Sequence, residues 1–360
     1  MSYLFQRLTA AALFAATTLI AHANGLPPVV RIGVASPSVG NPPRYTTGSI
    51  GLARHQGLID AEFKGTGTRI EWFFFKGAGP AVNEALTNRQ LDIVFQGDLP
   101  SLMAKAAGLN TRLVLPISIR SNVYLLVPPD SSIRGVADLK GRRVSLFRGT
   151  NAHLPINRIL AAHGLKERDV RLINFDNAAA QAALTTRDID AAFVGVESLK
   201  LVDKGIARIA YSTQGRSPVY TRQSALLATD DFARRHPDAV QRVVRGVVRA
   251  AHWASQEENR AEVFKTWALM GYPVSAFETD YARQPLKERL SPLFDPFLVG
   301  RYQDAVAGAR AFRLARGNID VERWIDRRFV DTALKDLKLT GYWQPLNAQG
   351  KPLTTQTAAR

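Results

Sequence analysis

Residues 139–164, LKGRRVSLFRGTNAHLPINRILAAHG, form the most informative stretch of the chain. The apolar run 144–147 predicts a short strand, Gly149 permits a tight turn, and a helix follows. Thr150 or Asn151 is expected to cap this helix, and its first-turn N–H groups then point outward. Free N–H groups at the positive end of a helix dipole favour a small anion. Because every α/β protein needs capped helices, this stretch alone favours a structural role, and the anion interpretation depends on the rest of the chain.

The same alternation of strand and helix continues on both sides of this stretch. Upstream, apolar and β-branched runs predict strands, and turns rich in Gly or Pro lead from them into helical segments. Downstream, the pattern repeats in a second unit from about 131 to 213. Strands that alternate with helices predict mostly parallel sheets, so we expect an α/β fold built from two units. The predicted strands are 29–35, 69–75, 92–95, 112–119, 123–127, 144–147, 170–175, 191–194, 207–211 and 225–229.

Two of these strands are expected to link the units as a two-strand hinge. The run 123–127 leads out of the first unit, and 225–229 returns the chain to it. Pro237 then begins a long helix to about residue 255, and the chain beyond it is predicted to be helical. The predicted organisation is a first lobe at 24–127, a second lobe at 128–222, the first-lobe return strand with C-terminal helices at 223–345, and a flexible tail at 346–360.

The N-terminus carries the pattern of a secretory signal peptide. Arg7 precedes an apolar stretch from 8 to 20 that is too short to span a bilayer comfortably, and Ala21-His22-Ala23 forms a cleavage site. We therefore interpret residues 1–23 as a cleaved signal and expect a periplasmic protein. No later segment has the length and apolarity of a transmembrane helix. The chain has no cysteine, which excludes disulfides and a lipid-bearing cleavage-site cysteine.

The net charge of +16 allows three kinds of anionic partner: nucleic acid, membrane surfaces and small anions. The basic residues are spread along the chain, and the densest clusters, at 142–143 and 234–235, are short. Export argues against nucleic acid. Scattered charge of this kind is most often a solvated surface, and a field that steers a small anionic ligand is the second interpretation.

Signatures of enzymes and cofactors are missing from the sequence. It contains no H-E-x-x-H, no G-x-S-x-G and no G-x-x-x-x-G-K-[ST]. The absence of cysteine excludes a thiol nucleophile and a zinc site built on cysteine. His153 and His163 are ten residues apart, which is not metal-ligand spacing on one helix face. The sequence thus predicts a binding protein with no cofactor, no metal and no catalytic residues.

Two segments of the chain resemble a known family. FFFKGAGPAVNEALTNRQLDIVFQGDLPSLMAKAAG and VPPDSSIRGVADLKGRRVSLFRGTNAHLPINRILAAHGL are similar to the periplasmic binding proteins of ABC importers for aliphatic sulfonates, relatives of the taurine- and nitrate-type binding proteins. The resemblance covers about residues 29–235. It implies a type II periplasmic binding fold, in which two α/β lobes close on a ligand about a two-strand hinge. It also implies a small organic oxyanion as ligand, and an ABC permease and ATPase as partners of a monomer.

The resemblance also implies ligand contacts at specific positions. Gly79-Pro80, Gly97-Asp98 and the turn with Thr150, Asn151 and His153 match motifs of the family. These motifs fall where loops leave strands for helices, the usual ligand edge of an open α/β sheet. Two further predictions do not come from these motifs: the hydroxyls of Tyr45 and Thr47 in the first loop, and Glu197 after strand 191–194. The predicted ligand-binding residues are Tyr45, Thr47, Gly79, Pro80, Gly97, Asp98, Thr150, Asn151, His153 and Glu197.

Several of these side chains have a structural alternative. Asp98 either contacts the ligand or caps the helix that contains Pro100, and Asp98 or Glu197 would hold an amine if the ligand carries one. His153 either donates to a sulfonate or packs against the helix start. Arg148 is a candidate bidentate partner for an oxyanion or a surface residue. Arg222 either lines the hinge or belongs to the surface.

Two departures from the family concern the organic tail of the ligand. The family often has an aromatic W-D-P-Y-like segment where this chain has Gly195-Val196-Glu197-Ser198-Leu199, and the first loop, 36–49, is longer than usual. The ligand class is therefore predicted more firmly than its identity. Nitrate, bicarbonate or a thiamine pyrimidine precursor are alternative ligands. A periplasmic enzyme or a sensory domain on the same fold is an alternative function.

Overall fold

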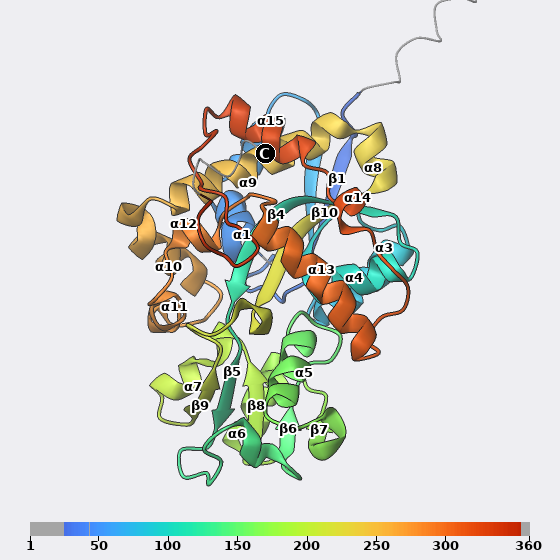
Figure 1. Ribbon diagram of the computed structural model, residues 1–360. Helices are drawn as coiled ribbons and strands as arrows, with labels where there is room; N and C mark the ends of the chain where they lie inside the picture. Colours follow the sequence, from blue (N-terminus) through green and yellow to red (C-terminus); the bar gives the residue numbers. More distant parts are fainter. Residues whose placement is uncertain (1–24, 43, 354–360) are drawn as a thin grey trace, which may run out of the picture.

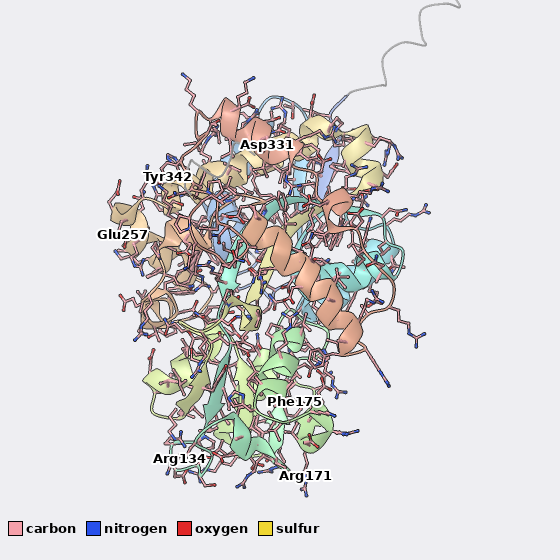
Figure 2. All side chains as sticks on the ribbon, viewed as in Figure 1. Arg134, Arg171, Phe175, Glu257, Asp331 and Tyr342 are labelled. Carbon is pink, nitrogen blue, oxygen red and sulfur yellow. The ribbon has the colours of Figure 1, made fainter. Side chains whose placement is uncertain are left out.

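The structure is a computed structural model that describes residues 25–42 and 44–353. The predicted signal peptide, residues 1–23, lies outside the described residues. The described chain forms an elongated molecule of two lobes: Asp331 and Tyr342 lie towards one end, and Arg134 and Arg171 lie at the other (Figures 1 and 2). Within the described ranges, no helix combines the length and apolarity needed to cross a membrane.

The first lobe is built on a five-stranded sheet in the order β2-β1-β3-β10-β4. β1 pairs in parallel with β2 and β3, whereas β10 lies antiparallel between β3 and β4. The late strand β10 thus enters the middle of a sheet whose other strands come from the first part of the chain. The bounds are β1 Val29–Val34, β2 Arg69–Phe74, β3 Ile93–Gly97, β4 Thr111–Ser121 and β10 Arg222–Thr229.

The second lobe repeats this arrangement with the order β7-β6-β8-β5-β9. β6 is parallel to β7 and β8, and β5 runs antiparallel between β8 and β9. The α/β fold of two units predicted from the sequence is confirmed, but both sheets are mixed, whereas mostly parallel sheets were expected. The bounds are β5 Tyr124–Val127, β6 Arg143–Ser145, β7 Arg171–Ile173, β8 Ala191–Val194 and β9 Arg208–Ser212.

The links between the lobes differ from the sequence prediction. We expected 123–127 and 225–229 to be hinge strands and placed the lobe boundary after 127. In the structure β5 is an interior strand of the second sheet, and β10 is an interior strand of the first. The chain crosses between the sheets at residues 122–123 and 213–221, just before these two strands. The prediction failed because a strand that is covered on both faces is a continuous apolar run, whether it lies inside a sheet or between two lobes.

Helices cover both faces of each sheet, and the C-terminal helices enclose the first lobe (Figure 1). α9 is the longest; Pro237 fills its first position, as predicted, where a missing N–H costs nothing. The first-lobe helices are α1 Gly48–His55, α2 Leu58–Phe63, α3 Ala78–Thr87 and α4 Asp98–Ala106. The second lobe has α5 His153–Ala162, α6 Asn177–Thr185 and α7 Lys200–Asp203, with the 3-10 turn η3 Val196–Ser198. The C-terminal helices are α8 Asp230–Arg235, α9 Pro237–Ala254, α10 Arg260–Ala268, α11 Val274–Tyr281, α12 Leu286–Arg289, α13 Pro296–Ala311, α14 Val321–Trp324 and α15 Arg328–Asp336.

The lobes have cores of unequal size. One large apolar cluster fills the first lobe and the C-terminal helices, whereas two smaller clusters lie on opposite faces of the second sheet. Alternate residues of β5 divide between them, with Leu125 in one cluster and Leu126 in the other. Leu154 of α5 is an exception, because this second-lobe residue packs into the first-lobe core. The two lobes are therefore in apolar contact beside the crossings.

The start of the predicted flexible tail is packed against the first lobe. Leu346 is 8% exposed, its N–H donates to Asp295, and its carbonyl accepts from Phe297 N–H. Arg120 donates to the carbonyl of Gly350 over 3.0 Å. Residues 346–353 thus differ from the prediction, and the reason is a set of backbone contacts that composition cannot reveal.

Candidate functional site

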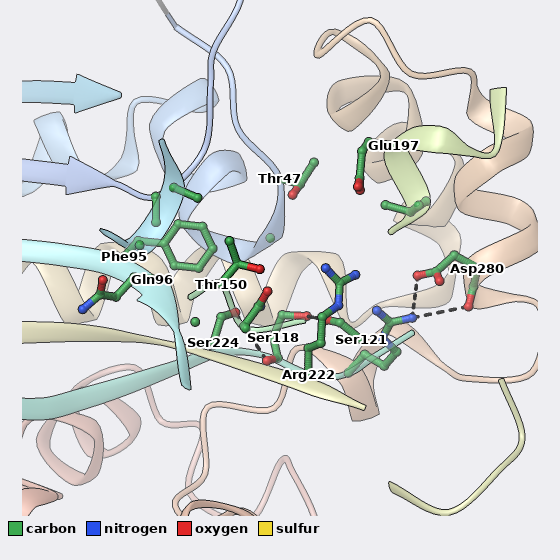
Figure 3. Close-up of a pocket in the computed structure, with 18 of the residues that line it drawn as sticks. Thr47, Phe95, Gln96, Ser118, Ser121, Thr150, Glu197, Arg222, Ser224 and Asp280 are labelled. Atoms are coloured by element: carbon green, nitrogen blue, oxygen red, sulfur yellow. Dashed lines mark hydrogen bonds and ion pairs between the residues drawn. The ribbon is translucent and has the colours of Figure 1, made fainter. Parts of the chain in front are cut away.

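Two connected cavities lie between the lobes. The inner cavity, of about 180 Å³, lies against the crossings; the outer cavity, of about 290 Å³, extends from it along the second lobe. Thr47, Thr150, Asn151, Glu197 and Arg222 line both, so the two form one continuous cleft. Figure 3 shows this region, with the Arg222, Ser118, Thr150 and Glu197 side chains extending into the same space.

Arg222 supplies positive charge to the inner cavity. It is the first residue of β10, just after the chain returns from the second lobe. One terminal nitrogen donates to the carbonyl of Asn122 over 2.7 Å, which fixes the side chain against the first crossing. Among the described residues, no carboxylate forms an ion pair with Arg222. A half-buried guanidinium without a counter-ion attracts an anion, and its planar fork suits two oxygens at once.

Hydroxyl groups from neighbouring strands surround this guanidinium. Ser118 and Ser121 lie near the end of β4, and their Oγ atoms are 3.1 Å apart. Ser224, two residues after Arg222 on β10, donates to the Ser118 carbonyl over 3.4 Å. β10 pairs residue 222 with residue 121 and residue 224 with residue 118, so this register gathers the groups at one sheet edge. Neutral hydroxyl donors beside one cation are suited to an oxyanion with several oxygens.

The start of α3 forms a second part of the inner wall. Ala78 adopts a positive φ of 53°, and α3 begins there, two residues before Pro80 instead of at Pro80 as predicted. Gly79 packs so closely on α4 that an added Cβ would lie 2.3 Å from Pro100. Glycine is therefore required at this contact. The first turn of α3 directs the positive end of its dipole at the cavity.

Gln96 presents a buried amide to the inner cavity. Its side chain is on β3, the residue is 1% exposed, and neither Nε2 nor Oε1 has a hydrogen-bond partner among residues 25–42 and 44–353. An unsatisfied buried amide costs free energy, about 1–3 kcal/mol for each polar group. A ligand or a water molecule that bonds to Gln96 would recover this free energy.

An ion pair, Asp280–Arg289, closes the end of the inner cavity nearest the crossings. Arg289 donates to Asp280 over 2.8 Å, and both side chains are almost fully buried. Tyr124 of β5 donates to the same carboxylate over 2.7 Å, and Asn122 donates over 3.0 Å. Burial alone would raise the pKa of Asp280, but the charge of Arg289 and these donors lower it below its usual value. Asp280 is thus ionised and fully partnered, and it joins α11 to both the first crossing and β5.

The turn singled out in the sequence, residues 148–153, provides the second-lobe wall. Thr150 and Asn151 line both cavities. Neither side chain caps α5, which begins at His153 after Ala152 with no side-chain cap. Instead the Thr150 hydroxyl donates to the Phe147 carbonyl over 2.8 Å. The capping prediction is wrong because this hydroxyl closes the preceding turn.

His153 and Arg148 turn away from the cleft. Gly149 N–H donates to His153 Nδ1, and His153 Nε2 lies 2.6 Å from a carboxylate oxygen of Glu167. The bond from His153 is the main reason that the pKa of Glu167 falls to about 2. Arg148 pairs with the other Glu167 oxygen at 2.9 Å. Neither residue lines the inner or the outer cavity, so both sides of the turn are held by one carboxylate.

Asp98 lies behind the cavity wall. It is the first residue of α4, with Gly97 in the cap position, so it is not the N-cap considered in the sequence analysis. Its carboxylate accepts from the N–H groups of Leu99 and Gln223 at 2.8 and 3.2 Å. Burial raises the pKa of Asp98 to about 7, and these two donors oppose the rise. The neighbouring Gly97 lines the inner cavity, whereas Asp98 lines neither cavity.

Of the other predicted residues, some line the inner cavity and some do not. Thr47, Gly79, Gly97, Thr150, Asn151 and Glu197 come together around the inner cavity. Pro80 is exposed and lies against Gly149 of the second lobe. Tyr45 lines a separate surface pocket beside His55 and Trp72.

Sequence reasoning missed the densest part of the site. Ser118, Ser121, Ser224 and Gln96 were not singled out, and Arg222 was weighed only as a hinge or surface residue. The available signal was an arginine next to an expected return strand, which becomes specific only when the pairing of β10 with β4 is known.

Comparisons with known proteins agree with the two-lobed α/β fold. A family model described as NMT1/THI5 like matches residues 74–261. An aliphatic sulfonates-binding protein of Escherichia coli K12 is 33% identical over 189 residues, which cover 51% of this chain and 54% of the relative. This alignment therefore spans about half the length of that relative.

Two solved structures match over most of the chain. The periplasmic sulfonate-binding protein from Methylobacillus flagellatus KT is 31% identical, with a TM-score of 0.76, and covers 90% of this chain and 98% of that protein. The alkanesulfonate-binding protein of Xanthomonas axonopodis pv. citri, solved with MOPS bound, is 28% identical with a TM-score of 0.71; the match covers 84% of this chain and 99% of that protein.

Proposed function

The chain belongs to the NMT1/THI5-like family, and from this premise we propose that it is the extracytoplasmic binding component of an ABC importer for small organosulfonates. The observation that carries the proposal is the Arg222 guanidinium in the inner cavity, which forms no ion pair within the described part of the chain and is surrounded by hydroxyls from both lobes. Sulfonate-binding relatives of known structure support the same ligand class.

The sulfonate head fits the inner cavity by charge and by donor number. A sulfonate has three oxygens and no donor of its own, and it stays ionised throughout the physiological pH range. Arg222 offers two N–H groups in one plane, and Ser118, Ser224 and Thr150 offer hydroxyls. The start of α3 at Ala78–Gly79 adds its dipole. This set neutralises one negative charge with one cation and otherwise uses neutral donors.

The organic tail would occupy the outer cavity. Phe95, Phe147, Phe193 and Tyr272 line it together with small residues of the first loop. No aromatic residue occupies 195–199, but these rings supply apolar surface from other elements. Burial of a tail against them contributes roughly 25 cal/mol per Å² of apolar surface.

Closure of the lobes would trap the ligand. In this structure Asn151 of the second lobe packs directly on Gly97 of the first, where an added Cβ would lie 2.3 Å from Asn151 Cβ. Arg158 of α5 pairs with Asp304 of α13 at 3.0 Å, and Leu154 packs beside it. Rotation at the two crossings would separate these contacts and open the cleft.

The biological context of the proposal follows from the ligand and the family. The protein would capture its ligand in the periplasm as a monomer and deliver it to a membrane permease driven by an ATPase. We propose no turnover of the ligand, since the similar proteins of known structure are sulfonate-binding proteins and the sequence has no cysteine to act as a thiol nucleophile. Nitrate, bicarbonate and a pyrimidine precursor, the alternative ligands, are tested in the same assay.

Thermal shift of the purified protein against a ligand panel tests the proposal. The panel contains alkanesulfonates, taurine, nitrate, bicarbonate and pyrimidine precursors. A ligand that binds only the native state raises Tm by mass action. We expect a shift with sulfonates, and recovery of the ligand unchanged after incubation. A shift with nitrate or pyrimidines alone would replace the ligand class, and conversion of a bound sulfonate would show an enzyme.

A further inference from the structure

A third cavity lies at the two crossings between the lobes. Its volume is about 290 Å³, and residues of both crossings, of the segment around the start of α12 and of the chain at 349–350 line it. Three of the lining residues are arginines, Arg120, Arg216 and Arg283, and none of them lines the inner or the outer cavity of the cleft. The arginines come from three separate segments, so the fold brings them together here. We call this cavity the crossing pocket.

Arg216 and Arg283 bring positive charge to the crossing pocket without a counter-ion. Within the described ranges, neither forms an ion pair with a carboxylate. Arg216 Nε donates to the Ser212 carbonyl over 2.9 Å, and its Cζ lies 4.7 Å from the centre of the Tyr211 ring. Arg283 is exposed, and a Cβ added at Gly215, beside Arg216, would lie 3.7 Å from one of its terminal nitrogens. Like charges that share one pocket repel, and an anion between them removes the repulsion.

Arg120 is the third cation of the pocket, and its charge is already balanced. It pairs with Glu288, and a terminal nitrogen donates to the Gly350 carbonyl over 3.0 Å. Its Nε is buried and has no hydrogen-bond partner in the described part of the chain. Glu288 is the one carboxylate among the described residues that line the pocket. The lining therefore retains the charges of Arg216 and Arg283, together with one buried N–H donor.

Gln284 adds a buried acceptor to these donors. It lines the crossing pocket, and its Oε1 is buried without a hydrogen-bond partner among residues 25–42 and 44–353. A buried oxygen without a donor is unfavourable, and a ligand that supplies an O–H group would satisfy it. At neutral pH phosphate carries negative charge and at least one O–H group, whereas sulfate carries charge but no O–H group. Cationic donors beside one acceptor therefore favour phosphate over sulfate.

Asn122 joins the crossing pocket to the cleft. It belongs to the first crossing and lines the crossing pocket. Its carbonyl accepts from Arg222 of the inner cavity over 2.7 Å, and its side chain donates to Asp280 over 3.0 Å. Thr213 of the second crossing donates to Asn122 Oδ1 over 3.4 Å. The segments that surround the crossing pocket thus also hold the head-binding wall of the cleft, so an ion bound here would act on the region about which the lobes rotate.

We propose that the crossing pocket binds inorganic phosphate and that the bound ion fixes the second crossing against the first lobe. Arg216 and Arg283 balance the negative charge of the ion, and Arg120 Nε donates to one of its oxygens. Gln284 Oε1 accepts from the O–H group of the phosphate, which keeps its proton. The pocket is separate from the sulfonate cleft, so the inference goes beyond the proposed function and does not depend on it.

Calorimetry on the purified protein without any sulfonate tests for the site. Inorganic phosphate and sulfate are titrated at neutral pH, at a constant ionic strength maintained with sodium chloride. We expect saturable binding of phosphate and about fivefold weaker binding of sulfate, which leaves Gln284 Oε1 without a donor. Equal affinities for the two ions overturn the assignment to phosphate, and the absence of saturable phosphate binding overturns the site.

Variants locate the bound ion. Arg216→Gln and Arg283→Gln are each expected to weaken phosphate binding about fivefold, the effect of losing one solvent-accessible charge pair. Gln284→Leu is expected to remove the preference for phosphate over sulfate. The control is Arg171→Gln, which changes the charge identically at an exposed residue at the far end of the second lobe (Figure 2). Equal losses in the control and in the pocket variants would mean an adventitious ion only, and a loss in Arg222→Gln alone would place the phosphate in the cleft.

Hydrogen exchange measures the effect of the ion on the second crossing. Saturating phosphate should slow amide exchange at 213–221 in the native protein but not in Arg283→Gln, because the ion links Arg216 of this segment to Arg283 between α11 and α12. Unchanged exchange in the native protein overturns the effect on the crossing. Neither measurement uses a sulfonate, so failure of the proposed function and failure of this inference are distinguishable.

Discussion

The two walls of the cleft are built in different ways. The polar part of the first-lobe wall is built mainly from side chains on neighbouring strands of one sheet, such as Ser118, Arg222 and Ser224, supported by the large core. The second-lobe wall consists of two turns, around Thr150 and around Glu197, that lie on a sheet with two small cores. Groups on paired strands keep a fixed spacing, whereas turns vary without disturbing the sheet. We infer that the first lobe supplies most of the affinity for the anionic head, whereas the second-lobe turns, together with Phe95 and Tyr272 of the first lobe, shape the site of the tail.

The largest expected effect comes from the first-lobe wall. Arg222→Gln removes the cation but keeps a side chain that can donate to Asn122. We expect affinity for every sulfonate to fall roughly 100-fold, because loss of one partner from a desolvated charge pair costs about 2–5 kcal/mol. Calorimetry measures the affinity for ethanesulfonate and for 2-aminoethanesulfonate, and we expect both affinities to fall by the same factor.

The matched control for this variant is Arg234→Gln. Arg234 is an exposed first-lobe residue that pairs with Asp231 on α8, and the substitution changes the net charge identically. Its affinities should match those of the native protein. If Arg222→Gln binds sulfonates normally, the division of roles between the lobes is incorrect and the anion lies elsewhere in the cleft.

A smaller effect is expected where the two walls touch. Gly97 has an ordinary extended backbone (φ −74°), so alanine fits its own strand end, but the new Cβ would collide with Asn151. Gly97→Ala should hinder closure and weaken sulfonate binding about tenfold, because only the closed fraction binds tightly. Small-angle scattering with ligand should show a more open molecule.

The double variant Gly97→Ala with Asn151→Gly separates closure from local damage. Removal of the Asn151 side chain clears the space that the new Cβ needs, so affinity should recover at least in part. If the double variant binds as weakly as Gly97→Ala alone, the loss arises within the first lobe instead of at the contact between the lobes.

Local sequence signals predicted the part of the cleft wall that is formed by turns. Thr150, Asn151 and Glu197 were predicted from strand–turn–helix junctions, and all three line the inner cavity; strand 191–194 was predicted with its observed bounds. The strand-borne half of the site could not be found in this way. Arg222 meets Ser121 and Ser118 only because β10 inserts between β3 and β4, a pairing across about 100 residues that no local pattern encodes.

Side-chain direction was the other limit of the sequence analysis. His153 belongs to a recognisable turn, yet its partner Glu167 lies on a different element and draws the ring away from the cleft. Asp98 follows a cleft glycine, but backbone donors from Leu99 and Gln223 hold its carboxylate behind the wall. Motif position predicted proximity to the site in both cases, whereas the hydrogen-bond partner decided the direction.

The carboxyl groups of Asp98 and Glu167 distinguish the two walls through the pH dependence of stability, and their expected effects are the smallest. The raised pKa of Asp98, about 7, means that ionising it destabilises the folded first lobe, so its contribution to stability is present at low pH and is lost as pH rises from about 4 to 7. The lowered pKa of Glu167, about 2, has the opposite sign, so its contribution is present above about pH 4.3 and is lost as pH falls towards 2. In ligand-free protein, the Tm of the native chain minus that of Asp98→Asn should fall by a few degrees across the upper window. The same difference for Glu167→Gln should rise with pH across the lower window. Parallel slopes for the two variants would contradict the assignment of a buried, nearly neutral carboxyl to the first-lobe wall and an ionised, paired one to the second.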